Sequence, residues 1–155
     1  MKDISLGKTD LKILKALQEN GRIKYSELAN QVGLTTSPCI ERIKRLERDG
    51  YISAYTAILN PKKLNASMVV LVQVRLDRSI KNSFEKFRKA VLNLPQVQEC
   101  YLVTGNYDFT IKARVSDMDA YRKFLESDLL SIAGVQESTS SVVIESIKES
   151  MALTL

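Results

Sequence analysis

Apolar residues recur at helical spacing in the first third of the chain, which predicts a group of short helices there. The first helix is expected to follow a cap at Thr9 and to end at about Glu19. The second is expected over Tyr25–Val32. It should stop at Gly33, because glycine tolerates the left-handed backbone that ends many helices.

A third helix is predicted between a cap at Thr35 or Thr36 and a stop at Gly50. Pro38 fits only because it falls in the first turn. The residues expected to face inward are Ile40, Ile43 and Leu46. Those expected to face outward are Ser37, Glu41, Lys44, Arg45 and Arg48, with Arg42 at the margin. A short helix, a tight turn and a basic helix are typical of a helix-turn-helix that places one helix in the major groove of DNA.

Beyond Asn60-Pro61, which marks a boundary, the apolar pattern alternates between strand and helix periods. Strands are predicted over Met68–Leu76, Val97–Thr104, Asp108–Val115 and Val135 to about Ile147. One helix should follow a capping box at Asn82 and end before Pro95. The other should follow Ser116 or Asp117, with Met118, Tyr121, Phe124, Leu125 and Leu129 facing inward.

This order of elements, β-α-β-β-α-β, predicts a ferredoxin-like antiparallel sheet with both helices on one face. The fold class is therefore α+β, with a winged-type helix-turn-helix over residues 1–60 and the sheet domain over 61–155. The other sheet face should be wet, yet the first strand also carries Val69 and Leu71 there. A second copy of the chain is the better candidate to cover that face, although the N-terminal unit is an alternative.

Composition narrows the possible chemistry. The net charge of +5 is mild, so the argument for nucleic acid rests on the placement of charges. The chain has no histidine, which removes a His general base, the Ser-His-Asp triad and His-ligated zinc or haem. We therefore expect no enzyme, no metal and no cofactor.

Cys39 and Cys100 are expected to be small buried apolar residues. A cytoplasmic, nucleoid-associated protein is expected, since neither a membrane span nor a signal-peptide core is visible.

Several motifs resemble the Lrp/AsnC family of transcription regulators, and the resemblance covers nearly the whole chain. The most specific is Ser37-Pro38-Cys39-Ile40-Glu41-Arg42-Ile43-Lys44-Arg45-Leu46-Glu47. Asp10-Leu11-Lys12-Ile13-Leu14, Gly21-Arg22, Leu28-Ala29, Val32-Gly33-Leu34 and Asn60-Pro61 also match, as does Val103-Thr104-Gly105-Asn106-Tyr107-Asp108. The resemblance implies a RAM/ACT-like second domain, dimers that join into rings such as octamers, and an amino acid bound between dimers.

The DNA-binding residues expected from this pattern are Thr36, Ser37, Glu41, Arg42, Lys44, Arg45 and Arg48. Arginine offers a bidentate fork to guanine, and both basic residue types bind phosphates. The alternative is a solvated charged helix with internal pairing between Glu41 and Arg45.

The turn from Gly105 to Asp108 is either an ordinary hairpin turn or an effector loop. As an effector loop, its N–H groups would bind a carboxylate and Asp108 would pair with an ammonium. Asn106 stands where the family usually has an acid, which removes one negative charge near the ligand. Further candidate effector residues are Leu102, Thr104, Tyr107 and Met118, with Ser141, Val142 and Val143 carried over from the family.

Two functions remain open. The first is a sequence-specific DNA-binding regulator whose assembly and DNA binding respond to leucine or another apolar amino acid. The second is a nucleoid-architectural protein that wraps double-stranded DNA with little effector response.

Overall fold

The structure is a computed structural model that describes residues 6–155, and its contacts divide the chain into two compact units. Unit 1 combines the described residues up to Ile58 with the C-terminal segment Lys148–Leu155, and unit 2 is Leu59–Ile147. The chain therefore passes between the units twice. This grouping differs from a single division after residue 60, because the last residues join the N-terminal unit.

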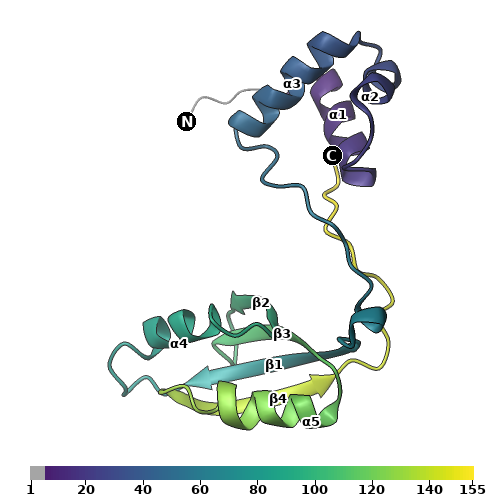
Figure 1. The fold of residues 1–155 in the computed structure, drawn as a ribbon. Helices are drawn as coiled ribbons and strands as arrows, with labels where there is room; N and C mark the ends of the chain where they lie inside the picture. The colour runs from purple at the N-terminus through teal and green to yellow at the C-terminus, as the bar shows by residue number, and fades with distance from the viewer. Residues whose placement is uncertain (1–5) are drawn as a thin grey trace. The chain divides into compact units, whose positions relative to one another are not determined.

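Unit 1 contains the three predicted helices, α1 (Lys8–Glu19), α2 (Tyr25–Val32) and α3 (Thr36–Arg48) (Figure 1). They pack around one apolar cluster, whose buried members are Ile13, Leu14, Leu28, Ala29, Val32, Cys39, Ile43 and Leu46. Gly33 has φ +73°, as the predicted stop requires. Cys39, rather than Ile40, faces the core most fully, since Ile40 is only half-buried.

The start of α1 differs from the prediction. Gly7 rather than Thr9 is the N-cap, and its N–H donates to the Asp10 carboxylate at 3.3 Å. A carboxylate three residues into a helix can bond back to the capping N–H, which explains why Thr9 lies inside the helix. At the start of α3, Thr35 occupies the cap position without a side-chain capping bond.

After α3 the segment Tyr51–Leu59 contains neither helix nor strand. A short 3-10 helix that the sequence reasoning missed, η1 (Pro61–Leu64), follows it. The Asn60 side chain caps this helix by accepting from the Lys62 N–H at 3.1 Å. Asn-Pro is thus a helix start here, with the asparagine as cap and the proline as first residue.

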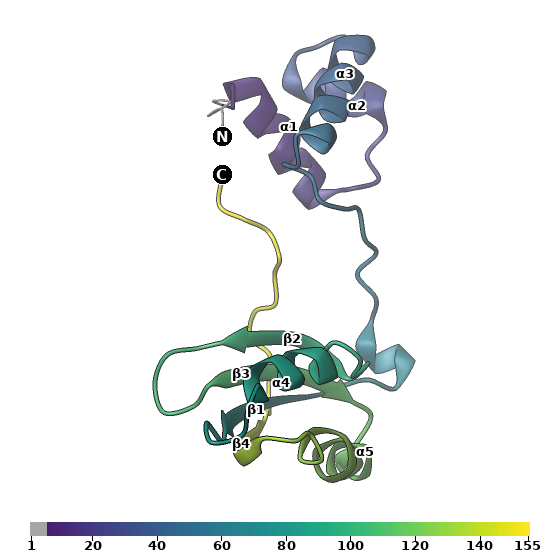
Figure 2. The ribbon, with the colours of Figure 1, turned by 90° about the vertical axis from the view of Figure 1, so that its left-hand side faces the viewer.

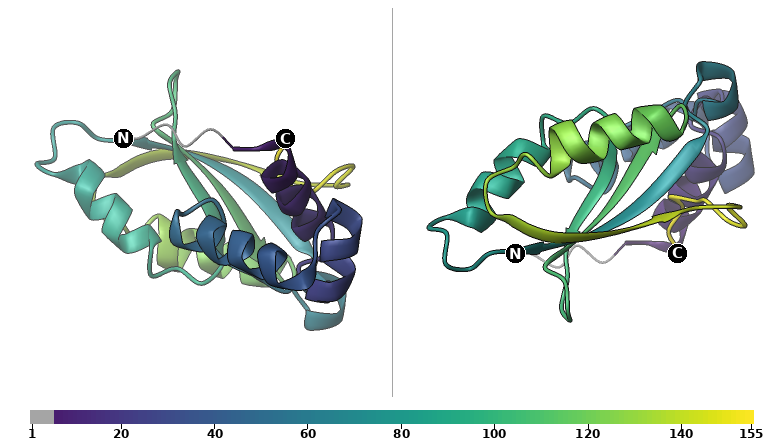
Figure 3. Two further views of the ribbon diagram at one scale, coloured as in Figure 1. Left: turned by 90° about the horizontal axis from the view of Figure 1, so that it is seen from above. Right: turned by 90° about the horizontal axis from the view of Figure 1, so that it is seen from below.

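Unit 2 has the predicted β-α-β-β-α-β order: β1 (Met68–Leu76), α4 (Ser83–Val91), β2 (Val97–Leu102), β3 (Phe109–Val115), α5 (Met118–Lys123), continued by a π-helical segment η2 (Phe124–Leu129), and β4 (Val135–Val142). The antiparallel sheet has the order β2-β3-β1-β4. Side chains of α4 and η2 pack on the inner face of β1 and β3, so the helices cover one face (Figure 2 and Figure 3).

Several details of unit 2 correct the predictions. Asn82 adopts a left-handed conformation and makes no side-chain cap bond, so the expected capping box is absent. Met118 points outward, with 55% of its surface exposed, because the helix buries Phe124 and Leu129 instead. Strands β2 and β4 are shorter than expected, and Cys100 is exposed. Asp117 does cap α5, and the bond from the Ala120 N–H lowers the pKa of its carboxyl.

On the sheet face opposite the helices, Val69 is buried and Leu71 is 41% exposed. The apolar character predicted for this face is therefore present, and part of it is open within one chain. No helix among residues 6–155 is long and apolar enough to cross a membrane.

Candidate nucleic-acid interface and effector loop

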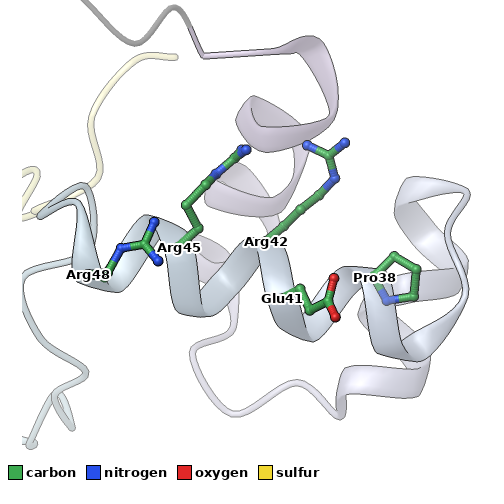
Figure 4. A pocket seen from close by; sticks show the side chains of 5 residues that line it. All are labelled: Pro38, Glu41, Arg42, Arg45 and Arg48. Atoms are coloured by element: carbon green, nitrogen blue, oxygen red, sulfur yellow. The ribbon is translucent and has the colours of Figure 1, made fainter. Parts of the chain in front are cut away.

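The outer face of α3 is polar and basic, as the sequence predicted. Its exposed residues from the predicted DNA-binding set are Thr36, Ser37, Glu41, Lys44 and Arg48. Arg42 and Arg45 are half-buried, because their side chains turn toward α1 (Figure 4). One helix therefore presents all seven predicted residues. Arg48 pairs with the neighbouring Asp49 at 3.1 Å, while Arg42 and Arg45 share a partner on another helix.

That partner is Asp10, in the first turn of α1. Its carboxylate accepts from Nη1 of Arg42 at 2.9 Å and from Nη2 of Arg45 at 2.7 Å. Asp10 is only 3% exposed, whereas the two arginine side chains are 38% and 40% exposed. Among the described residues, Arg45 thus pairs between helices and not with Glu41 of its own helix. The sequence reasoning missed this pairing.

Along the same side of α3 lies a shallow hollow of about 430 Å³, lined by Pro38, Glu41, Arg42, Arg45 and Arg48 (Figure 4). Three guanidinium groups line this surface beside the Glu41 carboxylate, and each of them also pairs with an aspartate, Asp10 or Asp49. Guanidinium groups bind phosphates and guanine edges through paired N–H donors. The surface is therefore chemically suited to a polyanion.

Tyr55 and Gln18 make further contacts within unit 1. The Tyr55 hydroxyl donates to Glu47 Oε1 at 2.9 Å. Partial burial of the hydroxyl, together with the neighbouring Glu47 carboxylate, raises the pKa of Tyr55. The Gln18 side chain makes two bonds with the backbone of Leu153: Nε2 donates to the carbonyl at 3.2 Å, and Oε1 accepts from the N–H at 2.6 Å. The C-terminal segment is thus held to α1, which no sequence pattern indicated.

The predicted effector loop joins β2 to β3, and Asp108 at its end is buried. The Asp108 carboxylate accepts from the Leu76 N–H at 2.9 Å and from Arg78 at 3.2 Å. A carboxylate has about four acceptor positions, so two donors leave capacity for an ammonium. Asp108 therefore anchors the hairpin to β1 and keeps unused acceptor positions.

Arg75 is a second basic residue at this loop that the sequence reasoning missed. Its Nε donates to the Asn106 carbonyl at 2.8 Å, and its guanidinium lies 5.3 Å from the centre of the Tyr107 ring. The Tyr107 hydroxyl bonds Thr139 of β4 at 2.8 Å. The position of Arg75 near the end of β1 could have suggested that it lies close to the loop. Its bond to a loop residue 31 positions away, however, has no local sequence pattern that would predict it.

Strand register separates the predicted effector residues into two groups. Leu102, Thr104, Gly105, Asn106, Tyr107 and Asp108 lie at the end of the sheet where Phe109 pairs with Val74. Ser141, Val142, Val143 and Met118 belong to the other end, where Val142 pairs with Val70 and Val115 pairs with Met68. On β1, Val74 and Val70 are four residues apart and Val74 and Met68 are six apart, which corresponds to roughly 13 and 20 Å. Within one copy, the Tyr107 hydroxyl reaches Thr139, two residues before Ser141, whereas Met118 lies at the far end of the sheet.

Both units of the chain match known protein families. Residues 6–53 match the family described as winged helix-turn-helix DNA-binding, and residues 69–153 match the Lrp/AsnC ligand binding domain. The chain belongs to the Lrp/AsnC family. This confirms the resemblance found in the sequence. It also makes this Lrp/AsnC protein a DNA-binding transcriptional regulator of the amino-acid-responsive type.

Individual relatives extend over nearly the whole chain. The leucine-responsive regulatory protein of Escherichia coli K12 is 47% identical over 150 residues, which cover 97% of this chain and 92% of that protein. A transcriptional regulator from Neisseria meningitidis, solved in complex with L-Met, is 39% identical with a TM-score of 0.93 and 97% coverage of both chains. An AsnC family regulator from Agrobacterium tumefaciens is 32% identical, covers 96% of this chain and 97% of its own, and has a TM-score of 0.91.

Proposed function

We propose that paired copies of this Lrp/AsnC protein bind specific double-stranded DNA through α3. The observation that carries this proposal is the exposed basic side of α3, on which three arginines surround one shallow hollow. Recognition helices meet base edges near their N-terminus and phosphates farther along. The proposed contacts are Thr36, Ser37, Glu41, Arg42, Lys44, Arg45 and Arg48.

Lys44→Ala should weaken binding to specific and non-specific DNA by a similar factor. Lys44 is exposed on α3, and a lysine that binds phosphate acts as a point charge without reading sequence. The slope of log affinity against log salt should fall by about 1. Lys86→Ala, an exposed lysine of α4, makes the same charge change in unit 2 and should leave both quantities unchanged. Equal affinities for Lys44→Ala and the wild type would remove Lys44 from the interface.

The effector is proposed to be an apolar amino acid such as leucine or methionine. Support comes from relatives named leucine-responsive regulatory protein and from the solved relative that contains L-Met. Asp108 would accept the ammonium, and loop N–H groups would bind the carboxylate. Because the two groups of candidate residues are separated along the sheet, we place each complete site between copies of the chain, in a homodimer that assembles further into a ring such as an octamer.

A ligand bound between copies should change the assembly, because it stabilises whichever assembly it binds more tightly. Leucine or methionine is expected to shift the sedimentation coefficient and to change operator affinity in parallel. Analytical ultracentrifugation and operator titration with a panel of amino acids would measure both. If no amino acid changes either quantity while DNA binding persists, the effector proposal fails and the DNA-wrapping alternative gains.

The proposed place of action is the cytoplasm, on nucleoid DNA. No catalytic step belongs to the proposal, since the chain lacks histidine and its matched domains bind DNA and a ligand.

A further inference from the structure

Asp10 is a buried carboxylate with two cationic partners, both on the helix proposed to bind DNA. It accepts from Arg42 at 2.9 Å, from Arg45 at 2.7 Å, and from the Gly7 N–H at 3.3 Å. One carboxylate shared between two guanidinium groups leaves this cluster with a net charge of +1. The cluster joins the first turn of α1 to the middle and the last turn of α3, across 32 and 35 residues of sequence.

We propose that Asp10 is a positioning residue, which holds the Arg42 and Arg45 guanidinium groups in the orientation that DNA requires. Arginine side chains have many rotamers, and fixing them during binding costs entropy. Asp10 fixes them before DNA arrives. This inference deepens the proposed function and depends on α3 being the DNA-binding helix.

The geometry favours orientation over masking. Each guanidinium has roughly five N–H donors, and the bond to Asp10 uses one terminal nitrogen of each arginine. Both side chains remain more than a third exposed and line the hollow along α3. An arginine can therefore keep its bond to Asp10 and present its remaining N–H groups to a phosphate.

The test is Asp10→Asn in the full-length protein, with operator affinity measured over a range of salt concentrations below the unfolding temperature. Removing the charge releases the arginines, so affinity should fall about ten-fold, without a steeper salt dependence. Masking predicts the opposite: higher affinity, with a slope steeper by about 0.9 for each additional phosphate that the freed arginines neutralise. A purely structural role predicts a lower Tm with unchanged affinity of the folded protein. Either of these two results would overturn the proposal.

A double-mutant cycle shows whether Asp10 acts through the arginines. In an Arg42→Gln, Arg45→Gln background, Asp10→Asn should have no further effect on operator affinity. A second loss as large as in the wild-type background would show that Asp10 acts by another route, and the proposal would be wrong.

Two further variants test the effect of a lost surface charge and of a displaced carboxylate. Asp119→Asn removes an exposed carboxylate that pairs with Arg122 in unit 2, and this matched change of charge should leave affinity unchanged. If Asp10→Asn does not fold, Asp10→Glu moves the carboxylate by one methylene, and a several-fold loss is expected; unchanged affinity would overturn the proposal. Wild-type protein that binds no DNA at low salt would instead end the proposed function itself.

Discussion

Asp108→Ala is expected to destabilise unit 2 and to abolish the amino acid response together. The Asp108 carboxylate, 7% exposed, is the acceptor for the buried Leu76 N–H at the end of β1. A buried donor left without an acceptor costs about 1–3 kcal/mol. Arg78 is 82% exposed, so its pair with Asp108 adds little to stability. Thermal unfolding should therefore show a lower Tm.

Asp108→Asn separates the stability effect from ligand binding. The amide oxygen can still accept from the Leu76 N–H, but the negative charge that attracts an ammonium is gone. The Tm should stay near the wild-type value, while the change in sedimentation with leucine or methionine should be lost. A full response in this variant would leave Asp108 with the hairpin role alone.

Asp77→Asn provides the matched control for this experiment. The Asp77 carboxylate is close in sequence to Arg78, and its bonds from the Ser79 hydroxyl and N–H lower its pKa. An asparagine oxygen can still accept these bonds, so the substitution removes the charge and keeps the turn. The amino acid response of this variant should equal that of the wild type.

The helices and strands of both units could be predicted because apolar residues, which become buried, recur along the sequence at helical or strand spacing. Strand β3 alternates between buried and half-buried residues along its whole length, which is the period-two pattern from which a strand can be predicted. Gly33 ends α2 in the left-handed conformation that its position demanded. These features depend on residues that are close in sequence, so a local sequence pattern is enough to predict them.

Contacts between distant segments were not predictable in the same way. The charged face of α3 looks uniformly solvent-exposed in the sequence, and only the packing of α1 against α3 reveals that Arg42 and Arg45 meet Asp10. Asp108 and Arg78, and Gln18 and Leu153, are likewise far apart in sequence, so their contacts depend on how the chain packs. The segment Lys148–Leu155 lies beyond the last predicted strand, so its association with unit 1 had no local signal.

Phe87→Ala should cause the largest loss of stability of the substitutions considered. The Phe87 ring is fully buried in the core of unit 2, and its centre lies 4.6 Å from that of Phe109. Truncation of a buried phenylalanine costs about 3–5 kcal/mol, through lost burial and the cavity that remains. The net stability of a domain is only about 5–15 kcal/mol, so this loss removes a large part of it and the Tm of unit 2 should fall markedly.

The loss should be confined to unit 2, because the two apolar cores share no residue. Hydrogen exchange resolved by segment should show lost protection in β1 and β3 and retained protection in α1 to α3. Operator binding should nevertheless weaken, since we propose that unit 2 joins the copies that present paired α3 helices. Leu28→Ala, which truncates a fully buried leucine of unit 1, should give the reverse exchange pattern. Loss of protection in both units after either substitution would mean that the two cores unfold as one cooperative structure.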